Sequence, residues 1–377
     1  QNKTMKNKIA IASAFLAASS FSMGKIVVND FLSFEGFVDS SYSTNQSDIA
    51  GTEESDNSFG IDQVEISWLF NFDAVTAQID LEYEDGDDDN NDGVEQAFVN
   101  YALGNGDVIT AGRYASMLGF EAFEPTGLYQ YSTAYDFSSI LGDANTLIQA
   151  IPGADAGAGT SNVEDEVDGL ATSEYVQGVK YTRTTDTTFF GISLQDQAFG
   201  NDGDRLGGDS DLDQDSSFAV EVAGSIDLGN GFTVFAGGAF EDAESGDNQL
   251  INAYVTYETG AWLFAAEVNV SELDGVALRL DGVNLEGDVD GLSAMLMANY
   301  AYSDVASVTA RISSLDYDAS GVDLELFKYT VAHNYALSDN LLLVTEISLD
   351  DGELDIDGVG NADGDNLTLA VELLFSF

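Results

Sequence analysis

Two sets of charged side chains in this sequence have types and positions suited to acting on ions. The acids of the first set share the segment 115–173, and they are Glu121, Glu124 and Asp136. The bases of the second set are assigned to the polar side of alternating stretches, and they are Arg113, Lys180, Arg311 and Lys328. Bases that face acids across a water-filled passage create a transverse field, which filters ions. The alternative is that these bases only balance neighbouring acids.

Side chains for covalent or acid–base catalysis are scarce. The chain has one histidine, His333, and no cysteine. A hydroxyl or thiol nucleophile needs a neighbouring base, which is most often a histidine. His333 alternates in step with Val331 and Tyr335, so we expect it on the apolar side of its strand. The sequence therefore predicts no catalytic residues and no enzymatic activity.

Two acidic runs, 85–93 and 209–215, carry oxygen ligands of the kind that Ca²⁺ prefers. The second run opens like an EF-hand loop, but the twelfth position counted from Asp209 is Val220 instead of the required Glu. Ca²⁺ binding by these runs is one interpretation, and solvated acidic loops are the other. The sequence predicts no other metal site and no cofactor.

Charge and composition narrow the class of protein. The chain has 67 acids against 11 bases, which gives a formal net charge of −56. A polyanion of this size repels nucleic-acid phosphate, so we expect no nucleic-acid partner. Only 2 Pro residues stand against 16 Tyr and 23 Phe, and aromatic residues are enriched in strands. We therefore expect an ordered, all-β protein.

The first residues are typical of an exported protein. A short basic start, Met5–Lys8, precedes the apolar run Ile9–Ser20, and Ser22–Gly24 supplies small residues at the spacing of a cleavage site. Residues 1–24 therefore resemble a secretory signal peptide, and 25–377 is the expected mature domain. That domain has no apolar run of about 18 residues, the length that a membrane helix needs.

Most of the mature sequence alternates with a period of two. In the stretch 74–84, Val75, Ala77 and Ile79 are interleaved with polar residues, and the pattern predicts sixteen such strands. Tight turns alternate with longer connections, which are 44–58, 85–92, 115–173, 197–216, 242–248, 273–290, 318–323 and 351–366. Short turns at one rim, long loops at the other and an even strand number are typical of a transmembrane antiparallel β-barrel. Aromatic residues near both ends of the strands fit the two membrane interfaces.

The third long connection, 115–173, is too long for a turn. Loops of this length are functional or disordered. It contains both prolines, Pro125 and Pro152, and its first half is rich in aromatic residues, which favours packing over solvation. Since a barrel of sixteen strands encloses an aqueous channel, we expect this loop to fold inward and form a constriction. External display of the loop is the alternative.

One stretch, 111–137, carries a resemblance at the level of residues. Its matching positions are Ala111-Gly112-Arg113, Gly119, Glu121, Pro125 and Tyr131-Ser132. They resemble the β-barrel porin-2 (OmpL-like) family, and sixteen strands with the longest loop after the fifth resemble general diffusion porins. The resemblance implies passive passage of small hydrophilic solutes through the bacterial outer membrane, often as a homotrimer in contact with outer-membrane lipid and lipopolysaccharide. The alternating stretch that ends in Phe377 resembles the signal read by the barrel-assembly machinery.

The excess of acids predicts which ions such a channel prefers. Inward-facing acids include Glu35, Asp39, Glu65, Asp80, Glu82, Glu221, Glu267 and Glu346. Acidic rings favour cations, so the sequence predicts a cation-preferring channel. The second hypothesis is a structural or adhesive surface protein, whose barrel only anchors acidic, Ca²⁺-binding loops. Electrical conductance separates the two hypotheses.

Overall fold

The computed structural model describes most of the chain. The described ranges are 24–49, 51–84, 92–141, 174–199, 218–243, 246–280, 283–319, 321–357 and 360–377. The expected signal peptide, apart from its last residue, lies outside them, as do the acidic run 209–215 and most of 85–93. Among the described residues, no helix combines the length and the hydropathy needed to cross a bilayer.

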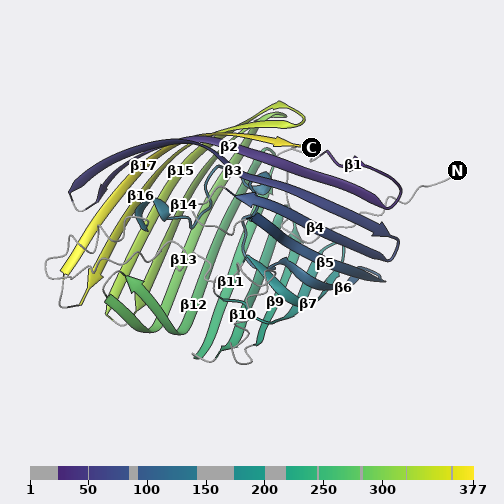
Figure 1. Ribbon diagram of the computed structural model, residues 1–377, viewed down its shortest axis with the longest axis horizontal. Coiled ribbons are helices and arrows are strands. Elements are labelled where there is room, and N and C mark those ends of the chain that lie inside the picture. The colour runs from purple at the N-terminus through teal and green to yellow at the C-terminus, as the bar shows by residue number, and fades with distance from the viewer. Residues whose placement is uncertain are drawn as a thin grey trace.

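The strands form one closed antiparallel sheet (Figure 1). Strands β2 to β17 pair in chain order, and β17 pairs with β2, which closes the ring. The predicted antiparallel barrel of sixteen strands is therefore confirmed. Its strands are β2 (Leu32–Ile49), β3 (Thr52–Phe72), β4 (Val75–Glu84), β5 (Asp92–Gly104), β6 (Asp107–Ala115), β7 (Tyr175–Thr184), β8 (Thr188–Gln195), β9 (Phe218–Gly229), β10 (Phe232–Ala243), β11 (Gly246–Thr259), β12 (Trp262–Leu280), β13 (Val283–Ser303), β14 (Ala306–Ala319), β15 (Val322–Ser338), β16 (Leu341–Ile356) and β17 (Gly360–Ser376).

One additional short strand, β1 (Ile26–Val27), lies at the seam where the ring closes. It pairs with Ser33 and Phe34 of β2, beyond the point where β17 ends. Phe377 extends the seam, because its N–H donates to the carbonyl oxygen of Gly36 at 2.9 Å and its carbonyl oxygen accepts from the Gly36 N–H at 3.0 Å. The first and last segments of the barrel are thus joined by backbone hydrogen bonds.

Strand β16 shows how alternation builds the wall. Ile347 and Leu349 are exposed on the outer face, whereas Glu346 and Ser348 are buried on the inner face. Successive side chains of a strand point to opposite faces of the sheet, so the period of two separates the two kinds of residue. The other strands repeat the pattern and create an apolar outer band, the surface that a transmembrane barrel presents to lipid.

Three of the predicted long loops are almost wholly strand, so this part of the sequence prediction was wrong. The segments 44–58, 273–290 and 351–366 belong to the hairpins β2–β3, β12–β13 and β16–β17. In the hairpin β16–β17 the alternation does continue, but the polarity of the two faces is reversed. A pattern with acids outside and apolar residues inside does not match that of a membrane strand, although it has the same period.

The reversal in β16 falls directly after Leu349. Asp351 and Asp355 are exposed on the outer face, and Leu354 is buried on the inner face. The neighbouring strands continue the acidic surface, since Asp355 is in register with Asp323, which in turn is in register with Asp318. Acids on the outer face mark where the barrel leaves the apolar band.

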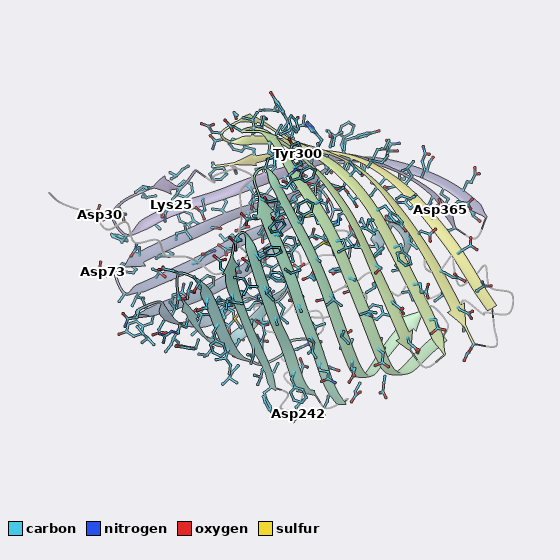
Figure 2. The ribbon with its side chains drawn as sticks, turned by 180° about the vertical axis from the view of Figure 1, so that it is seen from behind. Lys25, Asp30, Asp73, Asp242, Tyr300 and Asp365 are labelled. Carbon is cyan, nitrogen blue, oxygen red and sulfur yellow. The ribbon has the colours of Figure 1, made fainter. Side chains whose placement is uncertain are left out.

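Short connections lie at the opposite end of the barrel from these acidic hairpins. Asp73, Asn105 and Asn230 adopt φ angles of 61°, 56° and 56° in the turns. Asn and Asp tolerate this left-handed region better than other residues with a side chain, which explains the tight hairpins. Figure 2 labels Asp73 at this end and Asp365 at the other.

Candidate functional site: a loop anchored inside the barrel

The described part of the predicted constriction loop, 116–141, lies against the inner wall. Its regular elements are the short helices η1 (Pro125–Gly127) and α1 (Ser138–Leu141). Several of its residues are buried in one apolar cluster with wall side chains, and these are Phe120, Tyr129, Ala134, Tyr135, Phe137 and Ile140. The prediction that the loop folds inward is confirmed for the described residues, whereas 142–173 lie outside them.

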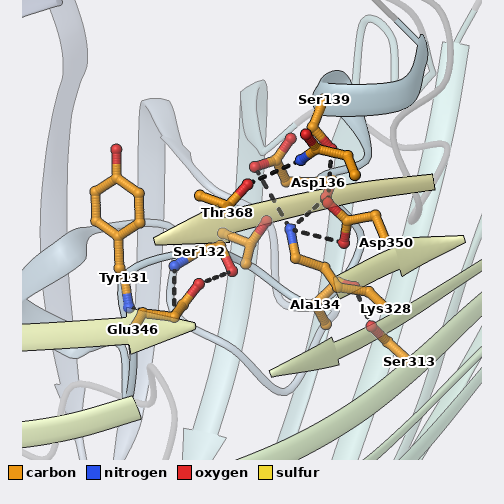
Figure 3. A network of polar contacts seen from close by, with 12 residues as sticks. Tyr131, Ser132, Ala134, Asp136, Ser139, Ser313, Lys328, Glu346, Asp350 and Thr368 are labelled. Carbon is orange, nitrogen blue, oxygen red and sulfur yellow. Dashed lines mark hydrogen bonds and ion pairs between the residues drawn. The ribbon is translucent and has the colours of Figure 1, made fainter. Parts of the chain in front are cut away.

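Carboxylates of the wall accept hydrogen bonds from the backbone of the loop. One oxygen of Glu346 on β16 accepts from the N–H groups of Tyr131 and Ser132 at 2.9 and 3.2 Å (Figure 3). Its other oxygen accepts from the Ser132 hydroxyl at 2.7 Å. Hydrogen bonds to a charged acceptor are roughly twice as strong as neutral ones, so Glu346 fixes the loop at this point.

Glu267 on β12 holds an earlier part of the loop in the same way. It accepts from the Phe120 N–H at 2.7 Å and from the Tyr135 hydroxyl at 3.1 Å. Glu221 on β9 accepts from the N–H of Met117 at 2.7 Å. These acids point inward, as the alternation predicts, but their oxygens are engaged by the loop.

Arg311 on β14 binds the loop through carbonyl oxygens. Its guanidinium donates to the carbonyl oxygens of Ser132 and Thr133 at 2.9 and 2.7 Å and pairs with Glu121 at 2.7 Å. The second oxygen of Glu121 accepts from the N–H of Ala134 at 2.6 Å. Arg311 and Glu121 are therefore in direct contact and do not face each other across a passage.

Lys328 on β15 holds the end of the described loop (Figure 3). Its Nζ donates to the carbonyl oxygen of Asp136 at 2.6 Å and lies 4.0 Å from the carboxylate of Asp350. Asp350 accepts from the Ser139 hydroxyl at 2.6 Å. The Asp136 side chain itself remains 44% exposed, so its charge is accessible to water.

The loop covers the two bases on this side of the barrel. Arg311 and Lys328 are only 1% and 3% exposed, so they do not form an open charged wall. Of the two interpretations left open by the sequence, balance of neighbouring acids fits these two residues. Burial desolvates both partners of such a pair, and the additional hydrogen bonds of Arg311 offset part of that cost.

The predicted base Lys180 on β7 lies in another sector of the wall. Its Nζ is 4.3 Å from the centre of the Tyr114 ring and donates to the carbonyl oxygen of Ala115 at 3.0 Å. It is in register with Thr110, which is buried on the inner face. Lys180 therefore faces inward at the start of the loop.

Arg113 on β6 was expected to face inward, and the register contradicts this. It is opposite Ala97 and alternates with Tyr114, which is buried on the inner face. Its Nε donates to the backbone carbonyl oxygen of Glu95 at 2.7 Å. Arg113 is near the end of a short strand, where a long side chain can reach polar groups from an outward position.

Glu124 contacts the sector of the wall formed by β3 to β7. One of its oxygens accepts from the Tyr175 hydroxyl, and the other accepts from the amide nitrogen of Gln63 at 2.9 Å. The carboxylates of Glu65 and Glu95 lie close to that of Glu124. This loop acid therefore faces other acids instead of the predicted bases.

Sequence reasoning missed Glu95 because a β-bulge changes the direction of its side chain. Asp80 on β4 is in register with Gln96 and the next residue, Leu81, with Val94, so Glu95 is the extra residue of β5. A bulge breaks the alternation and re-aims a side chain, and Glu95 is buried on the inner face. The adjacent polar residues Glu95 and Gln96 are the sequence signal for this bulge.

Aromatic residues pack the middle of the loop against the wall. The Phe120 ring stacks on Tyr129 with 6.4 Å between ring centres and meets Tyr254 of β11 at 5.6 Å. Burial raises the pKa of Tyr129 to about 12, and the nearby negative charge of Glu258 acts in the same direction. The Tyr129 hydroxyl therefore stays neutral near pH 7.

His333 is part of β15 and lies among aromatic residues. Its Nε2 is 2.7 Å from the Tyr302 hydroxyl, and its ring stacks on that of Tyr302 with 5.9 Å between centres. It alternates with Ala332 and Asn334, which are buried on the inner face. The outward position expected from the alternation agrees with this register.

No family model matches the chain, and no curated protein resembles it in sequence. Solved structures do resemble it in fold. The anion-selective porin from Comamonas acidovorans is 16% identical with a TM-score of 0.59, over 92% of this chain and 99% of that one. The outer membrane channel DcaP of Acinetobacter baumannii is 11% identical with a TM-score of 0.56, over 92% of this chain and 97% of that one. Salmonella typhi OmpF, in complex with daunomycin, is 14% identical with a TM-score of 0.56, over 94% of this chain and 100% of that one.

These similarities define the class of fold, which is that of the outer-membrane porins. The narrower resemblance to the porin-2 (OmpL-like) family is not confirmed, since no family model matches. An OmpT structure from Vibrio cholerae in a trimer form also shares the fold, with 13% identity and a TM-score of 0.55, over 92% of this chain and 99% of that one.

Proposed function

We propose that this chain forms a water-filled channel in the bacterial outer membrane, through which small hydrophilic solutes diffuse passively. The observation that carries the proposal is a loop anchored by charged residues inside a closed barrel of sixteen strands. A barrel of this size is too wide for wall side chains alone to fill. An anchored loop would narrow the aqueous passage and set the size limit for solutes.

The outer surface supports the membrane location. Large apolar side chains are exposed along the strands, as on Ile347, Leu349 and Leu369, and they suit outer-membrane lipid. The acids beyond this band would lie at the level of lipopolysaccharide. Residues 1–24 would direct export, and the barrel-assembly machinery would read the last strand with Phe377.

A homotrimer is the proposed assembly. One structure with the same fold is described as a trimer form, which supports this state by analogy. Passive transport through such an assembly needs no catalytic group, and the position of His333 among aromatic residues agrees with a protein that is not an enzyme.

We further propose that the channel prefers cations. Of the residues predicted for the constriction, Glu121, Arg311 and Lys328 position the loop. The Asp136 side chain is 44% exposed although it lies 3.9 Å from Lys328, and Glu124 has other acids beside it, so we expect these two acids to act on ions. The net charge of −56 adds to this field at the mouth. A porin with the same fold is described as anion-selective. We therefore expect the charges of this chain, and not its fold, to determine whether the channel prefers cations or anions.

The experiment that tests both proposals is conductance of the purified protein in a planar lipid bilayer. Discrete conductance steps and a reversal potential of the cation-selective sign across a KCl gradient are expected. The preference should weaken above about 0.1 M salt, where the Debye length falls below about 10 Å. The double variant Glu124→Gln, Asp136→Asn should reduce it. Absence of any conductance from folded protein would favour the hypothesis of a structural or adhesive surface protein. An anion-selective reversal potential would refute the proposed cation preference but not the proposed channel.

A further inference from the structure

Three carboxylates from adjacent strands meet on the inner wall. Glu65 on β3, Asp80 on β4 and Glu95 on β5 each offer one oxygen, and these oxygens all lie within 4.8 Å of one another. All three residues are buried. Like charges at this separation repel strongly in a poorly solvated site, so the cluster requires a compensating positive charge or bound protons.

One oxygen of this cluster is buried without a partner. Oε2 of Glu95 has no hydrogen bond, although the residue is only 7% exposed. The other two acids accept hydrogen bonds from neighbouring side chains. Asp80 accepts from Gln78 at 2.8 and 3.1 Å, and Glu65 accepts from Ser67 at 2.5 Å. A buried carboxylate oxygen without a donor is costly. The bulge in β5 turns the side chain that carries it to the inner face, where a Glu95 oxygen lies within 4.8 Å of oxygens of Glu65 and Asp80.

The basic residues of the described part of the chain do not supply the positive charge that would compensate these three carboxylates. The ion pairs of Arg183, Arg311 and Lys328 involve other acids. Arg113, which belongs to the strand beside β5, directs its Nε to the backbone oxygen of Glu95. In the part of the chain that the structure describes, no ion pair joins Glu65, Asp80 or Glu95 to a lysine or arginine.

We propose that Glu65, Asp80 and Glu95 bind one Ca²⁺ ion, with Glu124 of the loop as a further ligand. Two oxygens bound to one Ca²⁺ at about 2.4 Å can be at most about 4.8 Å apart, which matches the observed cluster. A donor set made only of oxygens selects Ca²⁺ over Zn²⁺ and other metals that prefer nitrogen or sulfur.

The ion would attach the loop to a second sector of the barrel. Arg311 and Lys328 hold the loop on β14 and β15, whereas Glu124 reaches β3 through Gln63 and β7 through Tyr175. A cation shared by Glu124 and the three wall acids would fix the loop on both sides of the barrel interior. The proposal concerns binding and stability, and it stands independently of conductance.

The first test measures binding to the purified, folded barrel after treatment with a chelator. Tb³⁺, which occupies Ca²⁺ sites, should give luminescence sensitised by Tyr175, whose hydroxyl contacts Glu124. Ca²⁺ should displace it with saturable, single-site behaviour. The isosteric substitution Glu95→Gln should weaken Ca²⁺ binding at least tenfold, and Glu124→Gln should weaken it less.

The second test compares thermal unfolding with and without Ca²⁺. In chelator, Glu95→Gln should unfold at a higher temperature than the native protein, because it relieves repulsion among the three acids. In Ca²⁺ the order should reverse, since only the native protein gains stability from the ion. A cluster held together by shared protons would show no such reversal, and that result would overturn the proposal.

A matched control separates this site from the acidic outer surface. The triple variant Asp318→Asn, Asp323→Asn, Asp355→Asn removes three charges that are in register and exposed. It should leave the sensitised emission and the Ca²⁺-dependent stabilisation unchanged. The proposal fails if the native barrel shows no saturable Ca²⁺ effect, or if this control abolishes the effect while Glu95→Gln retains it.

Discussion

Charged residues of the wall serve here as hydrogen-bonding partners for an irregular backbone. Arg311 donates to two carbonyl groups of the loop, and Glu346 accepts from two of its N–H groups. A loop inside a barrel has no strand ladder to satisfy these groups, and buried backbone groups need partners. A hydrogen bond to a charged group contributes about 1.5–3 kcal/mol, so a few wall residues can hold a long loop.

The Arg311–Glu121 pair yields a prediction at this scale. Arg311→Gln should lower the free energy of unfolding by about 3–5 kcal/mol, because it leaves the Glu121 side chain, which is only 10% exposed, without its charged partner. It should also open the loop to added protease. Unfolding in denaturant and the rate of loop cleavage measure the two effects.

The ion pair of Arg183 and Asp107 provides the control for this variant. Its charged atoms are 3.5 Å apart, and the Arg183 side chain is 54% exposed. Arg183→Gln should change stability by only about 0–1 kcal/mol. Similar effects of the two substitutions would contradict the anchoring role of Arg311.

At the scale of a strand, the reversal of polarity predicts the depth at which the proposed channel would lie in the membrane. The outer face of β16 is apolar through Leu349 and acidic from Asp351 onward. A charge facing lipid at mid-membrane costs about 2–4 kcal/mol, whereas one near the interface costs about 0–1 kcal/mol. We therefore expect the membrane boundary to cross β16 between these two residues.

Single cysteines on this face test the boundary, since the chain has no native cysteine. In protein reconstituted into liposomes, a water-soluble maleimide should label cysteines placed at Asp351 and Glu353, but not those at Ile347 and Leu349. The change should be a single step along the strand, because all four positions share the outer face. Labelling at every position would mean that β16 is not in contact with lipid.

Closure of the whole barrel depends on the seam between its first and last strands. A Cβ atom at Gly36 would lie 2.3 Å from the backbone oxygen of Glu65 and 3.0 Å from the Phe377 ring. Real Cβ atoms do not approach a backbone oxygen so closely, and β3 cannot move away without disturbing its own ladder. Close approach of β2 to its neighbours therefore requires glycine at this position.

Gly36→Val should destabilise the closed barrel by about 1–3 kcal/mol or more, the cost of overpacking a tight site. The expected result is a smaller fraction of protein with the heat-modifiable mobility of a folded barrel on gel electrophoresis. Gly93→Val is the control, since a Cβ there meets nothing within 4 Å. A normal folded yield for Gly36→Val would show that the seam tolerates a side chain.

The sequence alone determined the class of fold and the direction of many wall residues. A period of two separates Ile312 from Arg311, and the structure places Ile312 on the exposed face and Arg311 on the buried one. The prediction from alternation failed where the period of two continued but the polarity of the two faces was reversed, as after Leu349. It also failed at Glu95, where one extra residue in β5 turns a side chain inward.

Only the tertiary structure decided what the inward charges meet. Arg311 and Glu121 are 190 residues apart in the chain, and their 2.7 Å contact exists because the ring closes and the loop crosses its interior. Alternation assigns each side chain to a face of its own strand, which is a local property. The partner across the barrel depends on strand order, register and the path of the loop, and no local pattern encodes these, because they arise from the packing of distant segments.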